Sequence, residues 1–199
     1  MTALLDATAQ ILSEHTGIEA PQQEISKRAN VNSAMIRYYF GSKEGLLVAL
    51  LERDADAAMS ALNHLVAMDM PADRKLKIHI EGIINAYYRS PYLNRLIHYL
   101  MESGNSSNAD RVTEVFVKPM LTAYRAIIDQ GTAEGTLIEV EPELLYHALV
   151  GASEHLFYAS DSLARGRGRS GIDEDLKRRY FLLVSRVFIV GLQPGKEPG

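Results

Sequence analysis

The 199 residues suffice for one domain of ordinary size, or for one domain with a small module attached, and a hydrophobic content of 47% allows a substantial core. The formal net charge of −4 differs from the positive charge usual in proteins built wholly around nucleic acid. The absence of cysteine excludes disulfides and thiolate metal sites and agrees with a cytoplasmic location. No run of about 18 apolar residues predicts a membrane span, and the N-terminus lacks the pattern of a signal peptide.

Helical periodicity dominates the N-terminal part of the chain. The first predicted helix covers about residues 2–15, has Thr2 as its expected cap, and buries one face made of Leu4, Leu5, Ala7, Thr8, Ile11 and Leu12. Two short helices follow, over 22–29 and 33–39, joined by Asn30-Val31-Asn32. Asparagine tolerates the left-handed conformation that such a turn requires, and Asn32 can cap the second short helix.

The remainder of the chain also predicts helices and shows no strand alternation, so the fold class is all-α. Ser42 is suited to cap a long helix over 43–67. Further helices are predicted over 71–89, 91–103, 107–134, 141–163 and 173–191. Pro119 lies inside one of them, so that helix bends or begins there. Residues 193–199 contain two prolines and two glycines and predict a flexible tail.

Residues 18–40 have the pattern of a helix-turn-helix. Ile25 and Ala29 of the first short helix and Ile36 and Phe40 of the second are expected to share a small core, with Val31 filling the turn. No acidic residue falls between Glu24 and Glu44, so this window forms a positive patch in an acidic chain. A pair of short helices that merely packs is the alternative interpretation of the pattern.

The outer face of the second short helix carries residues suited to DNA. Ser33 and Ala34 are small enough to allow close approach to base edges, whereas Arg37 and Tyr38 can bond to guanine or phosphate. Lys43 stands at the start of the following helix, where free N–H groups and the helix dipole already favour phosphate.

Three segments carry a resemblance to a known family. They are Leu-Asp-Ala-Thr-Ala-Gln-Ile-Leu (5–12), Glu-Ile-Ser-Lys-Arg-Ala-Asn-Val-Asn (24–32) and Ile-Arg-Tyr-Tyr-Phe-Gly-Ser-Lys-Glu-Gly-Leu-Leu (36–47). They resemble the DNA-binding domain of the tetracycline-repressor (TetR/AcrR) family of transcriptional regulators. The resemblance implies about nine helices, a DNA-binding domain over 1–47, and a ligand-binding and dimerisation domain over 48–192, followed by the tail 193–199. It also implies a homodimer through the helices 141–163 and 173–191.

The resemblance further suggests which residues meet DNA: Gln22, Gln23, Ser33, Ala34, Arg37, Tyr38, Tyr39 and Lys43. Several positions depart from the family pattern. Asn30 stands where glycine is usual, Ala20 and Pro21 replace a capping Ser or Thr, and Arg37 stands where tyrosine is frequent. The chain also begins almost at the first helix, without the family's usual basic stretch, so a lower affinity for the DNA backbone is expected.

The C-terminal part gives weaker signals. Apolar faces on the last two helices predict either a dimer interface or intrachain core. Aromatic residues with polar tips predict the lining of a ligand cavity, and the candidates are Tyr88, His98, Tyr99, Tyr124, His155 and Tyr158. The spacing of His147 and His155 is a weak metal pattern, so no metal and no cofactor are predicted. The basic run 165–169 predicts a solvated loop, with nucleic-acid contact as the alternative.

The sequence therefore predicts a ligand-responsive transcriptional regulator. Its expected action is that of a repressor, which releases a palindromic operator in double-stranded DNA when a small molecule binds. An enzyme is not predicted, because the chain shows no nucleophile motif, no phosphate-binding loop and no pair of carboxylates at a spacing typical of general acid–base catalysis. The alternative function is that of a nucleoid or protein-interaction factor with the same fold and without sequence-specific repression.

Overall fold

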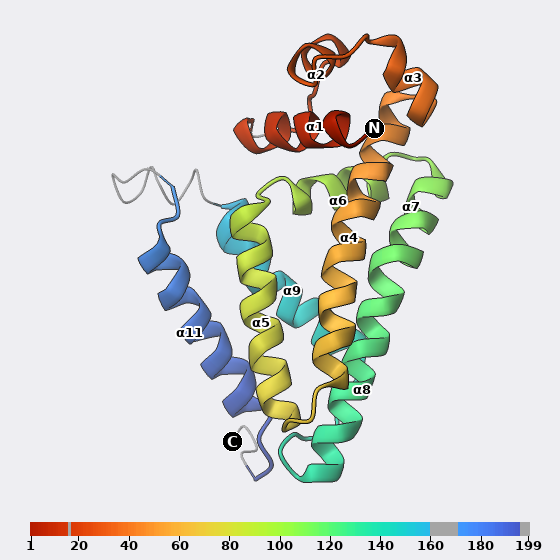
Figure 1. Ribbon diagram of the computed structural model, residues 1–199. Helices are drawn as coiled ribbons and strands as arrows, with labels where there is room; N and C mark the ends of the chain where they lie inside the picture. Colours follow the sequence, from red (N-terminus) through yellow and green to blue (C-terminus); the bar gives the residue numbers. More distant parts are fainter. Residues whose placement is uncertain (16, 160–170, 196–199) are drawn as a thin grey trace. The chain divides into compact units, whose positions relative to one another are not determined.

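The computed structural model describes residues 1–15, 17–159 and 171–195, and these residues form helices and connecting turns, with no strand among them (Figure 1). The helices are α1 (Thr2–Glu14), α2 (Gln22–Arg28), α3 (Ala34–Phe40), α4 (Lys43–Ala67), α5 (Ala72–Arg89), α6 (Leu93–Glu102), α7 (Ser106–Val112), the π-helical turn η1 (Thr113–Val117), α8 (Lys118–Glu134), α9 (Pro142–Tyr158) and α11 (Glu174–Gly191). When the continuous run α7–η1–α8 is counted as one, the described part of the chain contains nine helices. The all-α prediction is confirmed.

The chain divides into two compact units. The N-terminal unit comprises Met1–Ala58 and Ser90–Val117, and the C-terminal unit comprises Met59–Arg89 and Lys118–Gly199. These units differ from the division predicted at residue 47, because α6 and α7 pack with the N-terminal helices although they follow α5 in the sequence. Helical periodicity identifies the buried face of a helix, but it does not say which distant helix covers that face.

The core of the N-terminal unit explains why α1 forms where it does. All six residues of the predicted buried face of α1 are buried, so that prediction is confirmed. The five apolar residues of this face pack with Ile25 of α2, Ile36 of α3 and the first half of α4 in one hydrophobic cluster. The same cluster includes Leu93, Leu96 and Leu100 of α6. The expected cap is wrong, however, because Met1 is the N-cap and Thr2 is already the first helical residue.

The core of the C-terminal unit forms where α5 packs against α8, α9 and α11. It contains a buried polar pair, in which His79 Nε2 and Tyr124 Oη share a hydrogen bond of 3.0 Å. The amine of Lys75 is also inside, where it donates to the carbonyl oxygen of Val66 at 2.6 Å and to Gln130 Oε1 at 2.8 Å. These bonds satisfy polar groups whose burial would otherwise be costly.

Two helix boundaries bear on the predictions. Helix α8 begins at Lys118, directly after the π-helical turn, which agrees with the prediction that the helix bends or begins at Pro119. Helix α9 ends at Tyr158 with Ala159 as its C-cap, and residues 160–163 of the predicted helix lie outside the described residues, as does the basic run 165–169. Among the described helices, none combines the length and the apolar character that a membrane crossing needs.

Candidate nucleic-acid interface and ligand pocket

The turn between α2 and α3 depends on Asn30, which adopts a left-handed conformation with φ 53°. The N–H of Asn30 donates to the carbonyl oxygen of Lys27 at 3.2 Å, and the N–H of Val31 donates to that of Ser26 at 3.0 Å. These two bonds are the pair that ends a helix in a Schellman motif. The left-handed residue turns the chain outward, so Val31 is 37% exposed. The prediction that Val31 fills the turn is therefore wrong.

Helix α3 is fixed at both ends. At its start, Asn32 Oδ1 accepts a hydrogen bond of 2.8 Å from the N–H of Ala34, as predicted, although the N-cap residue of α3 is Ser33. At its end, Gly41 adopts φ 74° and its N–H donates to the carbonyl oxygen of Arg37 at 3.0 Å. Ser42 Oγ then accepts from the N–H of Gly45 at 3.0 Å, as predicted for the cap of α4. The ends of α3 leave little freedom in how it presents its outer face.

The eight predicted DNA-contacting residues come from the first turn of α2, from the cap and body of α3, and from the first residue of α4. Seven of them are exposed, and Tyr38 is the most exposed aromatic residue with 76% of its surface free. Lys43 is half-buried. The rings of Tyr38 and Tyr39 meet edge to face, with centroids 5.0 Å apart. These residues are thus close together in the sequence, within residues 22–43, and lie at the surface of the N-terminal unit.

The cations of this region differ in availability. Arg28 forms ion pairs with Glu14 at 2.6 Å and with Glu24 at 3.4 Å, so its positive charge is neutralised within the unit. Hydrogen bonding to Glu14 is the main reason that the pKa of the Arg28 guanidinium is raised. Arg37 and Lys43 form no ion pair with any described residue. Their charges are therefore available to an anionic partner such as a phosphate.

The six predicted ligand-binding residues are divided between the two units. His98 and Tyr99 lie exposed on α6 in the N-terminal unit, whereas the other four belong to the C-terminal unit. Of these four, Tyr124 is buried against His79, and His155 and Tyr158 are exposed neighbours on α9. Tyr88 is half-buried beneath the amine of Lys177, which lies 4.3 Å from its ring centroid. Residue type and helical spacing do not reveal how these helices pair.

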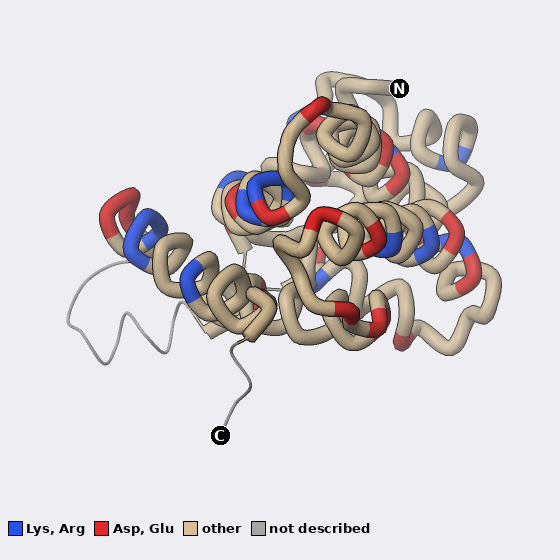
Figure 2. Tube along the Cα trace, turned by 90° about the horizontal axis from the view of Figure 1, so that it is seen from below, with Lys and Arg blue, Asp and Glu red and all other residues tan. Residues whose placement is uncertain are grey.

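A pocket of about 450 Å³ opens in the C-terminal unit between α5 and α11. This volume lies in the range of small-molecule sites. The pocket is lined by Glu81, Ile84, Asn85, Glu174, Asp175, Lys177, Arg178 and Phe181. Figure 2 shows acidic and basic residues together at the N-terminal end of α11. The sequence did not predict this pocket. Alternating charges over a helical turn are as typical of a helix face exposed to solvent as of a pocket lining, so the pattern does not distinguish the two.

Much of the charge around the pocket is internally paired. Lys177 bonds Glu174 at 2.7 Å, and this contact holds the pKa of the Glu174 carboxyl below its usual range. Asp175 pairs with Arg178 at 3.1 Å and with Arg179 at 2.9 Å, and its pKa is lowered for the same reason. The buried Ile84 and the half-buried Phe181 supply the apolar part of the lining.

Two family profiles match the chain. The profile described as "Bacterial regulatory proteins, tetR family" matches residues 4–50, and "Tetracyclin repressor-like, C-terminal domain" matches residues 69–196. The chain belongs to the TetR family. Members of the TetR family are transcriptional regulators with an N-terminal helix-turn-helix, so this protein is a DNA-binding regulator and not an enzyme.

Individual TetR-family relatives match either nearly the whole chain or a part of it. The HTH-type transcriptional regulator RutR of Escherichia coli (strain K12) is 24% identical over 194 residues, which cover 98% of this chain and 89% of RutR. BetI of Rhizobium meliloti is 38% identical over 66 residues, covering 30% of this chain and 32% of BetI. Among solved structures, the fatty acid degradation regulator FadR of Bacillus halodurans superimposes with a TM-score of 0.74 at 20% identity, covering 96% of this chain and 99% of that one. FadR of Bacillus subtilis in complex with stearoyl-CoA gives 0.76 at 17% identity, with 96% and 99% covered.

Proposed function

We propose that this TetR-family protein is a ligand-responsive repressor that binds a palindromic operator as a homodimer and releases it when a small molecule occupies the C-terminal unit. Residues 1–47 would carry DNA binding, residues 48–192 ligand binding and dimerisation, and 193–199 a flexible tail. We infer a cytoplasmic location, because a DNA-binding regulator needs access to DNA. The observation that carries the proposal is the outer surface of α3, where Arg37 and exposed Tyr38 follow the small residues Ser33 and Ala34, and where Arg37 forms no ion pair with any described residue.

The exposed surface of α3 suits the major groove. Small residues at the start of the helix let its backbone approach the base edges, and Arg37, one helical turn later, can donate two hydrogen bonds to a guanine. Tyr38, Tyr39 and Lys43 are placed to bond phosphate oxygens, which would fix the register of the helix on the duplex. Gln22 and Gln23 would contact the DNA backbone from the first turn of α2.

The homodimer is supported by the surfaces of α9 and α11. Leu183 and Val187 of α11 are each 59% exposed, and Leu144 of α9 is 60% exposed. Leu145 and Leu149 are instead buried within the unit, so only part of the predicted apolar face is free. Large apolar residues exposed on two neighbouring helices are typical of a surface covered by a partner. A two-fold dimer would present two α3 helices to half-sites about one helical turn apart.

The release of DNA requires that the effector bind two states with different affinity. The pocket between α5 and α11 has the volume of a small-molecule site, and the relative crystallised with stearoyl-CoA supports a ligand site in this fold. The predicted residues Tyr88, Tyr124, His155 and Tyr158 remain candidates for ligand binding in the C-terminal unit. Tyr88 lies beside the pocket, because its ring contacts Lys177, which lines the pocket. His98 and Tyr99 remain candidates from α6.

The proposal is tested by measuring the affinity of the purified protein for its own promoter region at controlled salt. Arg37→Ala is expected to cost about 1–3 kcal/mol, concentrated at one operator position, whereas Lys43→Ala should weaken binding to all sequences alike. Arg125→Ala, which removes an exposed arginine from α8, is the matched control and should leave binding unchanged. If Arg37→Ala and Lys43→Ala reduce the affinity equally for all DNA sequences, the result would support the nucleoid or protein-interaction role instead.

A further inference from the structure

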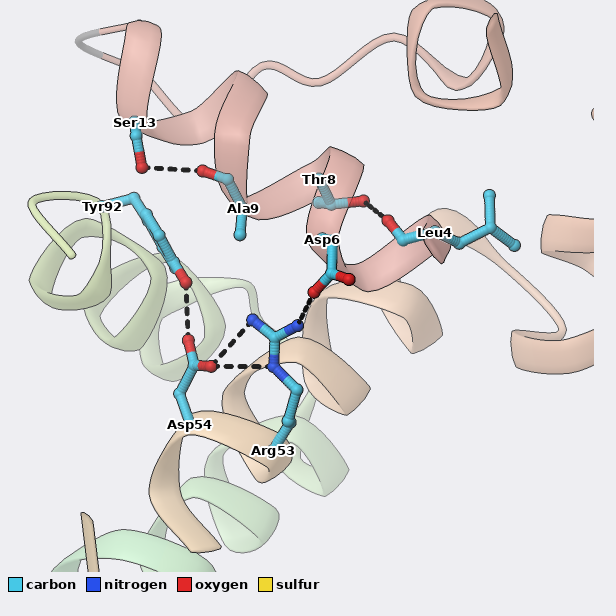
Figure 3. Close-up of polar contacts among 8 residues, drawn as sticks. All are labelled: Leu4, Asp6, Thr8, Ala9, Ser13, Arg53, Asp54 and Tyr92. Carbon is cyan, nitrogen blue, oxygen red and sulfur yellow. Dashed lines mark hydrogen bonds and ion pairs between the residues drawn. The ribbon is translucent and has the colours of Figure 1, made fainter. Parts of the chain in front are cut away.

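Helix α6 makes two polar connections to α1, and both start from its N-terminal residues. Tyr92 Oη donates a hydrogen bond of 2.7 Å to Asp54 Oδ2 on α4. The other oxygen of Asp54 accepts from Arg53 Nε at 3.0 Å, and Arg53 also reaches Asp6 of α1 at 2.7 Å (Figure 3). Tyr92 thereby orients the arginine that holds the first half of α1.

The second connection reaches the other end of α1. The guanidinium of Arg95 donates to the carbonyl oxygens of Leu12 and His15, each at 2.8 Å, and to that of Pro91 at 3.0 Å. The last carbonyl groups of a helix have no hydrogen-bond donor within the helix, and a cation at this end also interacts favourably with the helix dipole. Arg95 therefore acts as a C-terminal cap that is supplied from a helix about 80 residues further along the chain.

The position of α1 matters because it supports the helix-turn-helix. Its apolar face shares one core with Ile25 of α2 and Ile36 of α3, and α2 begins a few residues after α1 ends. Apolar contacts are non-directional, so they hold the helices together without fixing how far one slides along another. Directional bonds at both ends of α1 supply that missing constraint.

We propose that Tyr92 and Arg95 are positioning residues for DNA binding, which act by fixing both ends of α1 and so set where α2 and α3 lie. Neither residue needs to touch DNA. The DNA-binding unit of this protein then extends beyond the matched segment 4–50 to include the start of α6, in agreement with the compact unit that joins Met1–Ala58 to Ser90–Val117. This inference rests on the proposed function, because its main readout is operator affinity.

The test compares substitutions at the two residues under conditions where every variant is fully folded. Arg95→Ala should weaken operator binding about tenfold, and Arg95→Lys should restore part of this loss because its one ammonium nitrogen can still donate to a carbonyl oxygen of α1. Tyr92→Phe should weaken binding about threefold. Arg89→Ala, which removes an exposed guanidinium, is the matched control and should leave binding unchanged. Loss of folding stability alone would not change the affinity of folded protein.

Two further readouts separate positioning from direct contact. The slope of log affinity against log salt should stay at its wild-type value in Arg95→Ala, since a lost phosphate contact would reduce the slope by about one. Amide hydrogen exchange of free protein should accelerate at the end of α1 and in α2 in this variant, and stay unchanged in α8. Wild-type operator affinity in Arg95→Ala, a reduced salt slope, or unchanged exchange in α1 and α2 would each overturn the inference. A wild-type protein that binds no operator would overturn the proposed function, and the exchange measurement would still decide whether Arg95 fixes α1.

Discussion

Gly45, in the first turn of α4, faces the backbone carbonyl oxygen of Phe40, the last residue of α3, so closely that a Cβ at this position would overlap it. The carbonyl belongs to the backbone and cannot move without moving the end of α3. Between the two residues, Gly41 supplies the left-handed turn and Ser42 caps the new helix. The junction therefore sets a fixed and very short connection between α3 and the N-terminus of α4.

Gly45→Ala should for this reason destabilise the protein and weaken DNA binding. We expect a loss of about 1–3 kcal/mol in the free energy of unfolding, as for overpacked sites, measured by chemical denaturation followed by circular dichroism. Gly82→Ala is the matched control, because Gly82 lies in α5 with open space where a Cβ would be. This control should stabilise by about 0.5–1 kcal/mol. The same sign for both substitutions would contradict the steric argument.

Asn30→Ala should destabilise the protein by about 1 kcal/mol, because alanine lacks the local polar contacts that make the left-handed conformation tolerable for asparagine. Asn30→Gly should be close to neutral, since glycine adopts the observed φ of 53° without a steric cost. Thermal or chemical unfolding of both variants against wild type measures the difference. Equal stabilities of the alanine and glycine variants would show that the backbone conformation carries no cost here.

The turns around Asn30 and Gly45 also show what the sequence could and could not predict. The turn chemistry of Asn30, Asn32, Gly41 and Ser42 is local, so the bounds of α2, α3 and α4 followed from it almost to the residue. The orientation of Val31 did not follow, because hydrophobicity favours burial whereas the left-handed residue before it directs the side chain outward. The eight residues predicted to contact DNA lie near one another because they are close in the sequence.

Features that depend on packing between distant helices were not predicted. The bonds of Tyr92 and Arg95 to residues about 40 to 80 positions away leave no local pattern, and neither does the pocket between α5 and α11. The predicted ligand-binding aromatics were chosen by residue type, and helical spacing could not show that His98 and Tyr99 belong to the N-terminal unit. Periodicity gives the buried face of each helix but not its neighbour.

Val187→Glu should convert the proposed dimer into monomers. Val187 is 59% exposed on α11, so a charge there costs little within the chain, but it would be buried without a partner in an α9–α11 interface. Sedimentation velocity at several protein concentrations measures the change. Met101→Glu, at a residue that is 44% exposed on α6, is the matched control and should remain dimeric. A monomeric wild-type protein would contradict the proposed dimer, and a dimeric Val187→Glu variant would place the interface elsewhere.

His79 should make the stability of the protein depend on pH. Burial lowers its pKa to about 4 from an ordinary value of 6.5, so the folded protein keeps the imidazole neutral while the unfolded chain takes up a proton. The unfolded state therefore binds more protons as the pH falls from about 6.5 to about 4, and the free energy of unfolding should decrease over this window by about 3 kcal/mol. Above this window the contribution is fully present, and below it the loss is complete.

The measurement is a series of chemical denaturation curves between about pH 7 and pH 4 for wild type and His79→Gln. Carboxylates that titrate in the same range affect both proteins alike, so the difference between the two free energies isolates the histidine. The glutamine variant starts less stable, because its amide replaces a ring that packs on Tyr124 and bonds to it, but it should lose less stability on acidification. His64→Gln removes an exposed histidine and should retain the wild-type pH dependence. If His79→Gln and wild type lose stability in parallel, the imidazole is not held neutral in the folded core.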